Sequence, residues 1–94
     1  MIRIYVPKDS AARAVGADEV ADAIKAEAAA KSIDIQIVRN GSRGLHWLEP
    51  MVEVETGSRR VAYGPVEVAD IESLFLAKFY FGGEHRLSLG ITED

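Results

Sequence analysis

The fold of this chain is decided by residues 52–63, which read Val52-Glu53-Val54-Glu55-Thr56-Gly57-Ser58-Arg59-Arg60-Val61-Ala62-Tyr63. Apolar and charged side chains alternate here, and Thr56-Gly57-Ser58 is typical of a turn, so the sequence predicts two strands joined as a hairpin. Each strand then has one apolar and one polar face. A sheet covered on both faces would show continuous apolar runs instead, and we therefore expect every helix on one face.

Two further strands are predicted outside the hairpin. Apolar and polar side chains alternate at residues 2–6 and again at residues 33–37, and a helical crossover joins these two strands in parallel. Residues 86–89 are predicted to form a short extended tail. The expected fold class is therefore α/β. We expect a single two-layer βαβββα domain over residues 1–94, with a four-stranded mixed sheet and both helices on one face.

Two helices complete the predicted fold. Asp18 is a good N-cap for the first helix, which runs to about Lys31 and has buried positions four residues apart. Apolar residues at helical spacing predict a last helix over residues 68–81, and Gly82-Gly83 supplies its C-cap.

The composition excludes several classes of function. The 94 residues suffice for one core, and the absence of cysteine removes disulfides, thiolate metal sites and thiol catalysis. A net charge of −4 gives no support for a nucleic-acid partner, and we expect none. No apolar run reaches the ~18–20 residues that span a bilayer, and the N-terminus does not read as a signal peptide. A cytoplasmic protein without membrane insertion is expected.

The residues that carry chemistry do not form a recognisable constellation. Asp70 and Glu72 lie two apart on the predicted helix and point to different sides. The two histidines, His46 and His85, are far apart in the sequence, and no Gly-rich nucleotide fingerprint occurs. We expect no catalytic, cofactor-binding or metal-ligating residue, and no enzyme activity in this domain alone.

Four residues are candidates for an interface: Arg43, Trp47, Leu76 and Tyr80. Trp47 is either a core residue or an exposed anchor for a partner. Leu76 and Tyr80 form a second apolar stripe on the last helix, which is either deep core or a contact patch. Arg43 suits a docking rim. It also suits an anion site in the loop of residues 43–46, which gives a small-anion-binding or regulatory domain as the alternative function.

The spacing of several residues resembles a known family. Gly16-Ala17 opens the first helix, Pro50 precedes the hairpin, Tyr63 is followed by Val66, and Gly82-Gly83 ends the last helix. In this order they resemble the thioredoxin-like ferredoxins, which include the small iron–sulfur subunit of respiratory complex I. The four cysteine ligands of that family correspond here to Pro7, Ala12, Ser42 and His46. The resemblance implies the thioredoxin-like fold without the cluster, and no metal in this domain.

Three stretches, residues 2–7, 41–55 and 61–66, resemble one cluster-less version of this domain more closely. It is the N-terminal domain of the NADH-binding flavoprotein, or beta, subunit of NAD-dependent formate dehydrogenase. The resemblance implies an accessory domain for assembly or interaction, whose partners are other domains or subunits of a redox complex. The parent chain would be part of an oxidoreductase, with FMN, NAD and iron–sulfur clusters bound elsewhere. This chain is then expected to be a fragment of a longer one.

Overall fold

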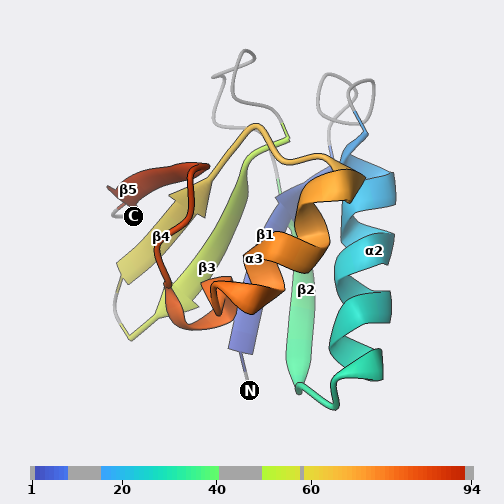
Figure 1. Ribbon diagram of the computed structural model, residues 1–94. Coiled ribbons are helices and arrows are strands. Elements are labelled where there is room, and N and C mark those ends of the chain that lie inside the picture. The colour runs from blue at the N-terminus through green and yellow to red at the C-terminus, as the bar shows by residue number, and fades with distance from the viewer. Residues whose placement is uncertain (1, 9–15, 41–49, 58, 93–94) are drawn as a thin grey trace.

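The computed structural model describes residues 2–8, 16–40, 50–57 and 59–92. Along these residues the chain forms strands, two α-helices and two short 3₁₀-helices (Figure 1). In chain order the elements are β1 (Ile2–Pro7), α2 (Ala17–Ala30), β2 (Ile35–Asn40), β3 (Val52–Thr56), β4 (Arg59–Tyr63), the 3₁₀-helix η2 (Val68–Asp70), α3 (Ile71–Leu76), the 3₁₀-helix η3 (Phe79–Phe81) and β5 (Ser88–Thr92). Within the described ranges, no helix is long and apolar enough to cross a membrane.

The strands form one mixed sheet in the order β2-β1-β3-β4-β5. β1 and β2 are parallel and β3 and β4 form an antiparallel hairpin, both as predicted. The pairs β1–β3 and β4–β5 are antiparallel as well. The prediction of four strands is wrong, because β5 pairs with β4 and Val61 lies opposite Ile91. Pairing of this segment gives partners to backbone groups at the edge of β4 that would otherwise need water.

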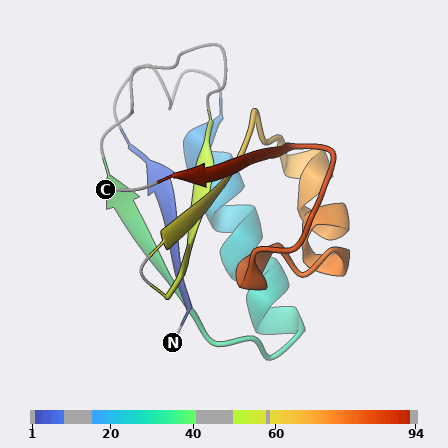
Figure 2. The same cartoon turned by 90° about the vertical axis from the view of Figure 1, so that its left-hand side faces the viewer.

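Both α-helices lie on the same side of the sheet, as two perpendicular views show (Figures 1 and 2). The core fills the space between the helices and the sheet. α2 buries Val20, Ile24 and Ala28 in it, which confirms the predicted stripe of this helix. From the sheet, fully buried side chains such as Ile4, Val52, Val54 and Tyr63 enter the same core.

The opposite face of the sheet carries a polar network. The Tyr5 hydroxyl donates to Glu55 Oε1 at 2.8 Å, and Arg3 Nη1 lies 3.4 Å from Glu55 Oε2. The Arg60 guanidinium lies 3.8 Å above the Tyr5 ring, and Glu53 is only 3% exposed. The face is polar as predicted, but it is not simply solvated, because the Arg60 side chain lies over Tyr5 and within 3.8 Å of Glu53.

α2 ends in a Schellman motif whose left-handed residue is Ser32, at φ 57°. The Ser32 N–H bonds the Ala29 carbonyl at 3.2 Å, and the Ile33 N–H bonds the Ala28 carbonyl at 2.9 Å. Ile33 therefore completes the end of the helix. The prediction that the second strand begins there is wrong, and β2 begins at Ile35 instead.

The predicted single helix over residues 68–81 is broken in the structure. α3 stops at Leu76, Lys78 adopts the left-handed conformation at φ 57°, and the chain continues as η3. The break turns Phe79 into the core, where its ring meets the ring of Phe75 edge-on at 5.1 Å between centroids. The stabilisation gained by burying Phe79 therefore outweighs that of the continuous helix which the apolar spacing predicts.

Gly83 makes this turn possible. A Cβ on Gly83 would lie 1.9 Å from the Ala77 carbonyl oxygen, so no side chain fits there. The Tyr63 hydroxyl donates to the Gly83 carbonyl oxygen, and burial raises the pKa of that hydroxyl. Gly82, at φ 80°, is the C-cap of η3, so the prediction of a glycine cap holds for the 3₁₀-helix rather than for a long α-helix.

Ser32→Gly is expected to stabilise the chain. Glycine adopts the left-handed conformation without the steric cost that serine bears, and we expect a gain of ~0.5–1 kcal/mol in the free energy of unfolding. Chemical denaturation of the two proteins, with Ser32→Ala as control, measures the gain. A Ser32→Gly variant less stable than the parent would contradict the assigned motif.

Gly83→Ala is expected to destabilise the chain by more than about 2 kcal/mol, because the new methyl group meets backbone rather than a movable side chain. Gly57→Ala is the matched control. Gly57, unlike Gly83, has a positive φ, of 65°, and nothing lies within 4 Å of its Cβ position. This variant should therefore cost only the ~1 kcal/mol of left-handed strain. Equal losses in both variants, measured by urea unfolding, would contradict the close contact.

Candidate contact surface

Large apolar side chains are exposed at the end of α3 and at the end of η3. Leu76 is 72% exposed and Phe81 is 67% exposed. The Tyr80 ring lies between the core and this surface, 5.6 Å from the Phe75 centroid and 4.8 Å from the Phe81 centroid. We call the exposed residues Leu76 and Phe81 the α3–η3 surface.

The course of the chain explains why these side chains lie outside. α3 directs Ile71, Leu74 and Phe75 into the core, which leaves Leu76 on its outer face. The left-handed residue Lys78 then rotates the chain so that Phe79 is buried, and Phe81 emerges two residues later. The exposure of the surface is thus a consequence of the packing below it.

The structure separates the two readings of the predicted second stripe. Leu76 belongs to the surface, whereas Tyr80 is half-buried and packs partly against the core. The other two candidate interface residues, Arg43 and Trp47, lie outside the described residues. The loop of residues 43–46, which the anion-binding alternative needs, lies outside them as well.

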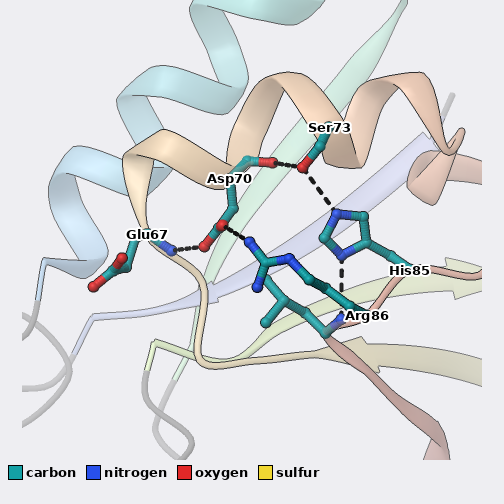
Figure 3. Close-up of polar contacts among 6 residues, drawn as sticks. Glu67, Asp70, Ser73, His85 and Arg86 are labelled. Atoms are coloured by element: carbon teal, nitrogen blue, oxygen red, sulfur yellow. Dashed lines mark hydrogen bonds and ion pairs between the residues drawn. The ribbon is translucent and has the colours of Figure 1, made fainter.

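A polar network joins α3 to the segment that leads into β5 (Figure 3). The buried Asp70 carboxylate accepts the Glu67 N–H at 2.9 Å and is also bonded by Arg86 Nη2. The Ser73 hydroxyl lies 2.9 Å from His85 Nε2. Sequence analysis missed this network. The spacing Glu67-x-x-Asp70, which is that of a capping box, was the signal that could have revealed half of it.

Ser73 and His85 are not arranged as a nucleophile and its base. His85 Nδ1 accepts the Leu87 N–H at 3.2 Å, so the ring proton of the neutral imidazole is on Nε2. The Ser73 hydroxyl in turn donates to the Asp70 carbonyl at 3.0 Å and accepts from Nε2. A catalytic base would need an unprotonated Nε2 facing the serine. The contact therefore positions the chain before β5.

The Arg39 side chain, from β2, forms hydrogen bonds with the end of β1 and the first turn of α2. Its Nε donates to the Val6 carbonyl at 3.1 Å, and its Nη2 donates to the Pro7 carbonyl at 2.9 Å and to Asp18 Oδ1 at 2.7 Å. Asp18 was predicted as the N-cap of the first helix. That prediction is wrong, because Gly16 is the N-cap and the Asp18 carboxylate binds Arg39 instead. Arg39 itself lies in β2.

Solved structures share the fold of this chain, although sequence comparisons find no relative. No protein-family model matches the sequence, and no curated protein is significantly similar to it. The chain is similar in structure to a thioredoxin-like [2Fe-2S] ferredoxin from Aquifex aeolicus, with a TM-score of 0.79 and 17% identity over 100% of this chain and 94% of that one. A second structure, of the wild-type ferredoxin, gives a TM-score of 0.77 and 18% identity over 96% of this chain and 97% of that one. A cysteine-to-serine variant gives 0.76 and 19%, over 96% and 99%. At these identities the likeness shows the fold alone, and the chain has the thioredoxin-like ferredoxin fold.

The residues of this chain do not fit a cysteine-held cluster. A [2Fe-2S] cluster is generally bound by four cysteine thiolates, and the chain has no cysteine. Of the four corresponding positions, Pro7 is described. It offers no side-chain donor, and its carbonyl accepts from Arg39. Ala12, Ser42 and His46 lie outside the described residues. Among the residues that the structure does describe, no group of three or more His, Asp or Glu could hold a metal ion.

We therefore expect the purified chain to stay colourless and free of iron after anaerobic cluster reconstitution. The physical reason is the absence of thiolate ligands at positions 7, 12, 42 and 46. Iron and sulfide analysis with an absorption spectrum measures the outcome, and a cysteine-ligated ferredoxin treated in parallel is the positive control. One cluster per chain, with visible absorption, would contradict the expectation.

Proposed function

We propose that this chain is an accessory domain that acts through protein contact and not through redox chemistry of its own. The α3–η3 surface supports the proposal, because Leu76 and Phe81 are exposed while Leu74, Phe75 and Phe79 of the same segment are buried in the core. Exposed apolar patches on soluble proteins often mark sites of contact with other proteins. Burying each against a partner is worth ~1.5–3 kcal/mol.

The partner complex is inferred from the sequence resemblance. We propose that the domain helps to assemble an NADH-linked flavoprotein subunit, as in the beta subunit of NAD-dependent formate dehydrogenase. The parent enzyme would be a cytoplasmic oxidoreductase that oxidises formate and reduces NAD. FMN, NAD and iron–sulfur clusters would be bound by other domains or subunits, and this chain would be one part of the longer subunit. The thioredoxin-like ferredoxin fold is compatible with descent from a cluster-binding domain.

Leu76 and Leu74 give a matched pair of variants that tests the contact function. They lie two residues apart in α3, but Leu74 is 0% exposed. Leu76→Ala should change the free energy of unfolding by less than ~0.5 kcal/mol and weaken association with the parent complex. Leu74→Ala should cost ~2–5 kcal/mol of stability, because it leaves a cavity in the core.

Thermal unfolding of each variant, together with co-purification of the parent complex, measures both effects. The proposal would be overturned if Leu76→Ala and Phe81→Ala, combined in one stable protein, left the assembly of the complex unchanged. It would also fail if Leu76→Ala destabilised the chain as strongly as Leu74→Ala.

A further inference from the structure

The α3–η3 surface lies in an acidic part of the molecule. Residues 67–86 contain four acidic and two basic side chains. One opposite pair, Asp70 with Arg86, is joined by an ion pair. The remaining charges, Glu67, Glu72, Glu84 and Lys78, are all exposed and sum to −2.

The neighbouring helix adds to this charge. α2 packs against α3. Near the ends of α2, Asp18 forms an ion pair with Arg39, and Glu27 forms one with Lys31. The other charged residues of α2 are exposed, and two of the three are acidic: Glu19, Asp22 and Lys25. The whole helical layer is therefore acidic.

The opposite face of the sheet differs from the helical layer. Its network balances two basic side chains, Arg3 and Arg60, against the two carboxylates of Glu53 and Glu55. A positively charged partner is thus attracted to the helical layer rather than to this face. Two of the exposed carboxylates also lie beside the α3–η3 surface in the sequence. Glu72 lies four residues before Leu76 on α3, so the two side chains are neighbours on one face, and Glu84 follows Gly83 at the other end of the segment.

We propose that the α3–η3 surface binds a different protein whose contact area is apolar at its centre and carries lysine or arginine at its rim. The proposal rests on the contact function proposed above and adds the chemistry of the partner. A second copy of this chain is a poor occupant, because symmetric pairing through this surface would place two patches of net negative charge against each other. A basic rim pairs with both carboxylates while Leu76 and Phe81 are buried.

The test uses two amphipathic helical peptides of equal length as probes, one built from leucine and lysine and the other from leucine and glutamate. NMR chemical shifts of the labelled chain locate each peptide, and titration gives its affinity. The Leu/Lys peptide should shift the resonances of residues 72–84 and bind at least ~10-fold more tightly than the Leu/Glu peptide, with an affinity that falls as salt is added.

Two charge reversals of equal size separate a local effect from one of net charge. Glu72→Lys should weaken binding of the Leu/Lys peptide about tenfold, a loss typical of a disrupted charge pair at an interface. Asp34→Lys is the matched control, because Asp34 is also exposed but lies between α2 and β2. It should weaken binding by less than about threefold, since distant exposed charges are screened.

The outcomes distinguish this proposal from the contact function itself. Equal binding of both peptides, equal loss in Glu72→Lys and Asp34→Lys, or shifts confined to the sheet would overturn the basic partner, even if Leu76→Ala still weakened the parent complex. Formation of a dimer through residues 72–84 at physiological salt, detected by sedimentation, would overturn it in favour of a second copy. Loss of the Leu76→Ala effect on the parent complex would instead overturn the contact function.

Discussion

The burial of Phe79 determines the course of the last third of the chain. Its ring is enclosed by Phe75 and Tyr63, which both meet it edge-on. To reach that position the backbone must leave the helix at Lys78 and return past Ala77, where only the absence of a side chain at Gly83 leaves room. The short α3, the exposed Leu76 and Phe81, and the path towards β5 all depend on this one packing contact. The surface at which we propose the contact function is therefore a consequence of packing in the core.

Polar side chains in this structure hold segments of chain in place. Arg39 joins β1, β2 and α2, and the Asp70 and His85 networks join α3 to the segment before β5. These polar groups all have backbone or side-chain partners, which keeps their desolvation from being costly. The thioredoxin-like ferredoxin fold is thus maintained here by ordinary packing and hydrogen bonds, in a chain that offers no thiolates.

The sequence predicted the strands best where apolar and polar residues alternate over a full strand, as in β1, β3 and β4. It misplaced β2, because Ile33 continues the alternation but its N–H completes the end of α2. The strand β5 was missed although Leu87, Leu89 and Ile91 alternate, since the pairing depends on a free edge of β4 that local pattern does not reveal. The break in the last helix could not be foreseen either. Residues 68–81 have helical spacing throughout, and the competing contact of Phe79 with Tyr63 is distant in sequence. For the same reason Leu76 and Tyr80 looked alike in the sequence, whereas only the first is a surface residue.

The sheet order also has a consequence for handling the chain at high concentration. Among the described strands, β2 forms one edge of the sheet, and its residues Ile35-Gln36-Ile37-Val38 are rich in β-branched side chains and contain no lysine or proline. Natural edge strands usually carry lysine or proline, which prevent pairing with a strand of another molecule. Here α2 packs on one face of the strand, and among the described strands only β1 pairs with β2, so no described strand covers its outer hydrogen-bonding edge. Partial loosening of α2 would expose a short segment of the kind that nucleates cross-β aggregates, so the colloidal behaviour of this chain is tied to the stability of its first helix.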